Sequence, residues 1–123
     1  MIDHVTLQVG DIPTSRAFYA AVLAPLGITP GAEDGAAVGF FGPQPGSFWI
    51  CPAEQEERRE LHIAFSARSR QVVRAFHQAA LDIGAEVLHA PRLFPEYHDD
   101  YFGAFVRDPD GHNIEAVCHL QEE

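Results

Sequence analysis

The feature that most constrains the fold is an internal repeat. Residues 61–77, LHIAFSARSRQVVRAFH, align without a gap on residues 3–19, DHVTLQVGDIPTSRAFY, and His62 falls on His4. The offset is 58 residues (62 minus 4) in a chain of 123, which divides the sequence into two nearly equal halves. A duplicated structural unit is the simplest account of this pattern.

Both halves begin with a predicted β-strand that has one apolar and one polar face. Polar and apolar residues alternate in residues 2–9 and again in residues 60–66, which is typical of a half-buried strand. His4 and His62 lie on the polar face of their strands. We expect the apolar faces to pack against helices and the polar faces to remain open.

A helix is predicted after each of these strands. Asp11 and Ser69 can cap the two helices, and Gly27 and Gly84 follow where a C-terminal glycine is favoured. Three short strand candidates then follow in each half, around residues 28–33, 36–41 and 47–51, and around 85–90, 101–107 and 113–120. The sequence therefore predicts an α+β fold of two βαβββ modules.

The chain has the length of one domain, residues 1–123, with repeat units at about 1–52 and 58–120. Two modules side by side should give a cupped mixed sheet with the helices on its outer face. Acidic residues outnumber basic ones 18 to 8, for a net charge of -10, so we expect no nucleic acid and no anionic membrane as partner. No apolar run reaches the roughly 20 residues of a membrane span, and we expect a cytoplasmic protein.

The last predicted strand suggests what the two histidines do. In NIEAVCHL, Glu115 lies opposite the apolar face formed by Ile114, Ala116, Cys118 and Leu120. His4, His62 and Glu115 thus come from three strands and point to the same side, and two imidazoles with one carboxylate can hold a divalent metal with open positions. A single strand histidine more often packs or is solvated, so the residues alone leave both interpretations open.

The two βαβββ units, the paired histidines and the stretch FVRDPDGHNIEAV resemble the vicinal oxygen chelate superfamily, the group of glyoxalase I, bleomycin-resistance proteins and extradiol dioxygenases. The resemblance covers essentially the whole chain. It implies paired modules around a cupped sheet, a divalent metal held by His4, His62 and Glu115, and a homodimer. Short members of this group often build their sites across the dimer interface.

The sequence differs from several of the families it resembles, and these differences reduce the number of candidate functions. Glyoxalase I has a fourth, acidic ligand on the last strand of the first unit, whereas the matching stretch SFWICP places Phe48, Trp49 and Ile50 there. Metal-free bleomycin-binding members lack the triad. Fosfomycin-type thiol transferases are similar in size, but their site is rich in cationic groups and this chain contains no lysine.

Further residues are candidates for the pocket. Tyr97, His98 and Tyr101, just before a strand, could supply a proton or orient a substrate, or could simply form an aromatic rim. Phe48 and Trp49 could line the cavity wall.

The expected function is that of a divalent-metal-dependent enzyme acting on a small oxygen-chelating substrate, with lyase, isomerase or dioxygenase-like chemistry. Iron, manganese, nickel and zinc are not separated by this ligand set. The alternative is a non-catalytic small-molecule-binding or antibiotic-resistance protein of the same fold, or a fosfomycin-type thiol transferase.

Overall fold

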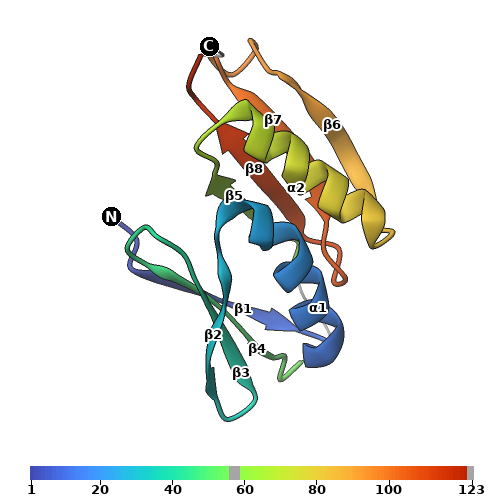
Figure 1. Cartoon of the computed structure of the whole chain (residues 1–123). Coiled ribbons are helices and arrows are strands. Elements are labelled where there is room, and N and C mark those ends of the chain that lie inside the picture. Colours follow the sequence, from blue (N-terminus) through green and yellow to red (C-terminus); the bar gives the residue numbers. More distant parts are fainter. Residues whose placement is uncertain (56–58, 122–123) are drawn as a thin grey trace.

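The computed structural model describes residues 1–55 and 59–121; residue 58, the expected start of the second unit, lies outside them. Each half is a βαβββ module (Figure 1). The first module consists of β1 (His4–Val9), α1 (Ile12–Leu23), the 3-10 turn η1 (Ala24–Leu26), β2 (Thr29–Asp34), β3 (Ala37–Phe41) and β4 (Ser47–Pro52). The second consists of β5 (His62–Ser66), α2 (Arg70–Asp82), β6 (Val87–Leu93), β7 (Phe102–Arg107) and β8 (Asn113–Cys118).

The two modules form two separate four-stranded mixed sheets with the same topology. The strand orders are β1-β4-β3-β2 and β5-β8-β7-β6, and in each sheet the first and last strands of the module pair in parallel. The predicted α+β fold of duplicated modules is confirmed. Because β1 and β5 each occupy a sheet edge, the two sheets do not close on one another within the chain.

The helix boundaries follow from the capping residues that the sequence offers. The Asp11 carboxylate accepts from the Thr14 backbone N–H and the Ser69 hydroxyl from the Val72 N–H, which satisfies donors at each helix start. Two hydrogen bonds from Thr14 hold the pKa of Asp11 below its usual value. Gly27 ends η1 at φ 78°, a conformation that glycine adopts without strain.

One apolar core joins the two modules. Figure 1 shows α1 and α2 next to each other, and the two helices pack together between the modules. Tyr19 is fully buried beside Phe48 of β4, and the ring of Phe48 lies 5.3 Å from that of Phe65 on β5. The helices therefore fix how one sheet is placed relative to the other.

A polar contact, here called the clasp, adds to this packing. The DPDG turn after β7 carries Asp108, whose buried carboxylate accepts from the Tyr19 hydroxyl at 2.5 Å, and Asp110, which accepts from the Gly10 backbone N–H at 3.0 Å. Burial, and then the nearby Asp108 carboxylate, raise the pKa of Tyr19, so its hydroxyl keeps its proton. The turn predicted from the sequence thus also bonds the second module to the first.

Two local expectations are wrong. β8 ends at Cys118, and Leu120, predicted on its apolar face, is 61% exposed beyond the strand end. β6 runs over Val87–Leu93 instead of starting near residue 85, because residues 84 and 85 still belong to the turn that ends α2. Among the described residues, no helix is long and apolar enough to cross a membrane.

Candidate metal centre

The second sheet brings together a histidine and a buried carboxylate. β5 and β8 pair in parallel with Ala64 opposite Glu115, which places the side chains of His62 and Glu115 on the same face. The Nε2 atom of His62 lies 2.7 Å from Oε1 of Glu115. Glu115 is only 1% exposed, whereas His62 is half-exposed, so the pair opens to solvent on the histidine side.

Tyr101, directly before β7, completes the surroundings of this carboxylate. Its hydroxyl donates to Oε2 of Glu115, so both carboxylate oxygens are bonded. Burial, and then the bond to Glu115, raise the pKa of Tyr101 and keep it a proton donor. A Cβ at Gly103 would come within 3.3 Å of Oε2 of Glu115 and 3.4 Å of the Tyr101 ring, so the absent side chain leaves room for this contact.

An aromatic cluster surrounds the pair on the same face. The ring of Phe105, the partner of Glu115 across β7 and β8, lies 5.7 Å from the His62 ring. Tyr97 is 59% exposed and packs its ring against that of Tyr101 at 5.0 Å. His98 is stacked on His119 at 4.9 Å and also contacts Tyr101. Of the three loop candidates, only Tyr101 bonds to Glu115 directly. The sequence did not predict Phe105 as a neighbour of His62, because its place in the alternating pattern is that of an ordinary buried strand residue.

His4 lies apart from His62 and Glu115. It stands on the exposed face of β1, and its Nδ1 atom is 2.7 Å from Oδ1 of Asp3. In the described parts of the chain, no three His, Cys, Asp or Glu side chains are grouped closely enough to hold one metal ion. Asp3 was also missed, although its place directly before His4 was a signal, since carboxylates often orient metal-binding imidazoles.

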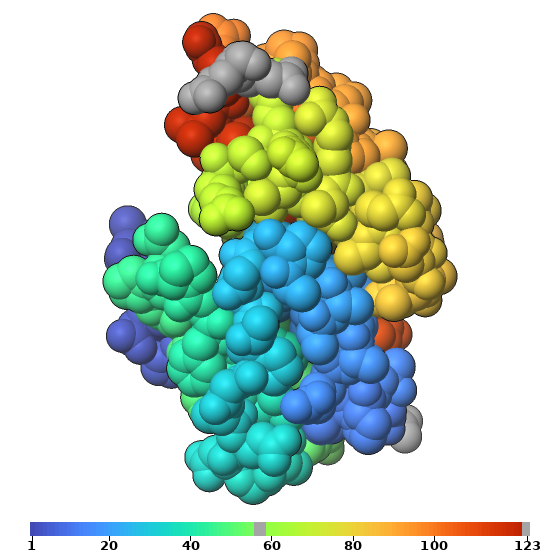
Figure 2. All heavy atoms as spheres, in the orientation of Figure 1, coloured from blue at the N-terminus to red at the C-terminus, as the bar shows by residue number. Residues whose placement is uncertain are grey.

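Both histidines line a groove between the two open sheet edges. The groove has a volume of about 1000 Å³, and its walls come from residues 2–5 and 42–48 on one side and residues 62–68 on the other. It opens at the left of Figure 2, between the green and yellow-green segments. The first and second modules thus present their histidines across the same opening.

The two predicted wall residues lie on opposite faces of β4. Phe48 is buried on the helix side among the core rings and reaches one end of the groove. Trp49 lies on the other face, in register with Thr6 and on the side of His4.

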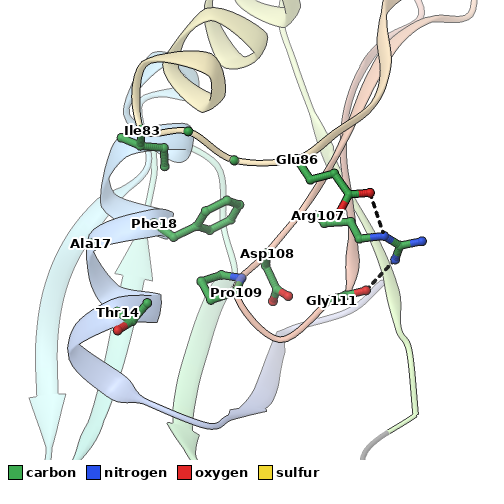
Figure 3. A pocket seen from close by; sticks show the side chains of 11 residues that line it. Thr14, Ala17, Phe18, Ile83, Glu86, Arg107, Asp108, Pro109 and Gly111 are labelled. Carbon is green, nitrogen blue, oxygen red and sulfur yellow. Dashed lines mark hydrogen bonds and ion pairs between the residues drawn. The ribbon is translucent and has the colours of Figure 1, made fainter.

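A second hollow, of about 570 Å³, lies at the clasp (Figure 3). Thr14 and Phe18 of α1 face the DPDG turn across it. Arg107 lines this hollow. Its guanidinium group donates hydrogen bonds to Glu60 and, at 2.6 Å, to the Gly111 carbonyl, and it forms an ion pair with Glu86 at 3.7 Å. All of these partners belong to the second module, and neither His62 nor Glu115 lines this hollow.

The pair on the second sheet fits a divalent metal as two of its ligands. An imidazole nitrogen and a carboxylate oxygen that share one hydrogen bond are donors that a borderline metal prefers. A carboxylate buried to this degree is stabilised by a positive partner, which a metal supplies. A third protein ligand is needed for the expected triad, and the chain places His4 away from the other two.

Paired βαβββ modules, with a histidine and a glutamate on the open face of the second sheet, define the class of fold to which the chain belongs. A family model described as the Glyoxalase/Bleomycin resistance protein/Dioxygenase superfamily matches residues 1–116. The chain belongs to this superfamily. No curated protein sequence matches the chain significantly.

Solved structures of similar proteins share this fold. A glyoxalase/bleomycin resistance protein from Albidiferax ferrireducens is 29% identical, with a TM-score of 0.84 over 96% of this chain and 98% of that one. A putative glyoxalase from Bacillus halodurans is 20% identical, with a TM-score of 0.75 over 96% and 95%. A lactoylglutathione lyase from Agrobacterium tumefaciens is 17% identical, with a TM-score of 0.73 over 96% and 92%.

Proposed function

We propose that this protein is a homodimeric, divalent-metal-dependent enzyme that acts on a small substrate through adjacent oxygens of that substrate. The observation that carries the proposal is the buried Glu115 carboxylate, 2.7 Å from His62 Nε2 on the open face of the second sheet. When bound, the metal supplies Lewis-acid activation of oxygens coordinated at its open positions. The reaction class is that of a lyase, isomerase or dioxygenase-like enzyme.

The chain's own residues have distinct tasks in this proposal. His62 and Glu115 hold the metal, and Tyr101 fixes the Glu115 carboxylate by donating to its other oxygen. Because the single O–H of Tyr101 is donated to Glu115, its oxygen is left to accept a hydrogen bond from a donor group of the substrate. The aromatic cluster around His62 keeps water away from one side of the site.

His4 of a second copy is the proposed third ligand. Within one chain, His4 does not join His62 and Glu115. The core and the clasp hold the two modules in place, so a hinge motion that closes the groove would have to break buried contacts. The open edges of β1 and β5 can instead pair with those of an identical chain in a two-fold dimer, which removes both exposed edges.

The metal content of purified variants tests the triad. Alanine substitution of His4, His62 or Glu115 should each remove most of the bound metal, measured by elemental analysis after loading with Zn²⁺ and dialysis. His77→Ala, a histidine on the far side of the second sheet on α2, is the matched control and should keep full occupancy. Full occupancy in His62→Ala would contradict the proposal, and a wild-type protein without affinity for metal would favour a non-catalytic binding protein.

Mixing two defective variants tests whether the site is shared. When His4→Ala and Glu115→Ala are unfolded and refolded together, about half of the dimers are mixed, and each mixed dimer regains one of its two sites. About a quarter of the wild-type metal should therefore return. The control mixture of His62→Ala with Glu115→Ala should regain none, because both changes affect the same module. No recovery in the first mixture, with mixed dimers demonstrated by two affinity tags, would refute the shared site.

A further inference from the structure

The repeat shows which residue of the first module stands where the second module has its metal-binding carboxylate. Ala64 of β5 pairs with Glu115 of β8, and Thr6 of β1 pairs with Trp49 of β4. Thr6 and Ala64 are separated by the repeat offset of 58 residues (64 minus 6). Trp49 is therefore the counterpart of Glu115, so an indole ring occupies the position of a second carboxylate.

The indole ring is held flat on the first sheet. A Cβ on Gly39 of the neighbouring strand β3 would lie 2.8 Å from two carbons of the Trp49 ring, so the ring covers this glycine closely. The indole N–H donates to the Ser47 hydroxyl at 3.0 Å, which fixes the direction of the ring along the sheet. Trp49 is only partly buried, so its position is set by the protein while part of its surface stays accessible.

A second ring extends this surface in the same way. Phe41, at the end of β3, is 38% exposed and lies edge-on to Trp49 with ring centroids 5.8 Å apart. A Cβ on Gly31 of β2 would lie 2.9 Å from the Phe41 ring. Two glycines on adjacent strands thus make room for two aromatic rings, and Trp49 and Phe41 together are called the aromatic platform below.

The platform begins next to His4. Ser47 is the register partner of His4 across β1 and β4, and Trp49 lies two residues further along on the same face. With a rise of about 3.3 Å per residue and strands about 4.8 Å apart, the Cα atoms of His4 and Trp49 are separated by roughly 8 Å. A small ligand bound at a metal near His4 can therefore reach the platform with a ring attached to its chelating atoms.

We propose that the aromatic platform binds a planar aromatic group of the substrate, so that the substrate class is an aromatic compound whose two metal-binding oxygens lie within two carbons of a flat ring. The part of this inference that concerns the two metal-binding oxygens rests on the proposed metal-dependent function. The part that concerns the aromatic ring depends only on Trp49 and Phe41. Stacking on an indole face favours flat, polarisable rings over small aliphatic groups of the same charge.

The test compares two probes that share one chelating group. Benzoylformate and pyruvate are both 2-oxo acids with one negative charge, and they differ in carrying a phenyl or a methyl group. Trp49 is the only tryptophan of the chain, so fluorescence excited at 295 nm reports on the platform alone. Binding of each probe to the dimer, with Zn²⁺ and without metal, is measured by this fluorescence and by calorimetry.

Benzoylformate should bind about tenfold more tightly than pyruvate and quench the Trp49 fluorescence. Trp49→Ala should bring the ratio of the two affinities close to one without changing the metal content or the dimer, and Trp49→Phe should restore part of the preference. Equal affinities in the wild type, no quenching by benzoylformate in either form, an unchanged ratio in Trp49→Ala, or loss of metal or of the dimer in that variant would each overturn the inference.

Failure of the metal proposal gives a different pattern. In that case, the protein binds no Zn²⁺ and the alanine variants of the triad behave like the wild type, yet the phenyl preference and its dependence on Trp49 remain in the metal-free protein. Conversely, full metal occupancy with no phenyl preference would reject the platform and leave the metal proposal standing.

Discussion

The bond between Tyr19 and Asp108 offers a direct measure of how firmly the two modules are joined. Tyr19→Phe removes only the hydroxyl that donates to Asp108 at 2.5 Å and keeps the ring that packs at 4.9 Å from Phe18 and from Phe48. The Asp108 carboxylate stays 5% exposed and keeps two backbone donors, from Asp110 and His112. The variant therefore isolates one hydrogen bond to a buried charge.

The expected loss follows from that environment. Tyr19 donates to Oδ2 of Asp108, whereas the two remaining donors both bind Oδ1. A hydrogen bond to a charged group contributes about 1.5–3 kcal/mol, so we expect a loss of about 2 kcal/mol in the free energy of unfolding. For a chain of this length, the melting temperature should fall by roughly 6–10 °C. Asp108→Asn should couple to Tyr19→Phe, so that the double variant loses less than the sum of the single losses.

Urea unfolding followed by circular dichroism, at one fixed protein concentration, measures these losses because a dimer's stability depends on concentration. Tyr97→Phe is the matched control: Tyr97 is 59% exposed, so its loss should stay within about 0.5 kcal/mol. If Tyr19→Phe and Tyr97→Phe are equally stable, the clasp does not hold the modules together.

The same bond predicts the response to alkaline pH. The pKa of Tyr19 is raised in the folded protein, by burial and then by Asp108, so the protonated hydroxyl stabilises the fold. This contribution is fully present below the unfolded pKa of about 10 and is lost as the pH rises above it. Tyr101 has a raised pKa as well, so the alkaline loss of stability should become smaller in Tyr19→Phe without disappearing.

Two further predictions concern the first module. Because the stretch SFWICP of the first module offers no acidic residue, the hemithioacetal of methylglyoxal and glutathione should show negligible turnover with Zn²⁺, Ni²⁺ or Mn²⁺, and efficient isomerisation would reveal a further metal ligand. Gly39→Ala places a Cβ 2.8 Å from the Trp49 ring and should displace it, at a cost of about 1–3 kcal/mol in stability. An unchanged Trp49 emission spectrum in Gly39→Ala would contradict the close packing on which the platform depends.

The sequence predicts the parts of this fold that depend on local patterns. Alternation places His62 and Glu115 on one face, and the capping residues Asp11 and Ser69 mark the helix starts, because strand and helix periodicity act over a few residues. The bond from Tyr19 to Asp108 joins residues 89 positions apart, and no local pattern signals such a contact.

The placement of one module relative to the other cannot be predicted from local sequence patterns, for the same reason. Alternation assigns each side chain to a face, but the angle between two sheets depends on how α1 and α2 pack and on the clasp. The sequence therefore grouped His4 with His62 and Glu115 by face, whereas the chain separates His4 from the other two. Leu120 was also misplaced. The alternation of apolar residues continues in the sequence as far as Leu120, but strand pairing stops at Cys118, so Leu120 is exposed.

The two copies of the repeated module have become different in one position that matters for chemistry. The second module carries a buried carboxylate at the position where the first carries an indole ring on a glycine. On the proposed function, the second module holds the metal through His62 and Glu115, while the first supplies one ligand, His4, and the surface beside it. Because His4 is not grouped with His62 and Glu115 within one chain and the clasp bonds the two modules to each other, the proposed two-fold dimer gives each metal one module of each kind. A chain of this size can thus build two complete sites from two half-sites, and any substitution that loosens the clasp should weaken metal binding at both sites together.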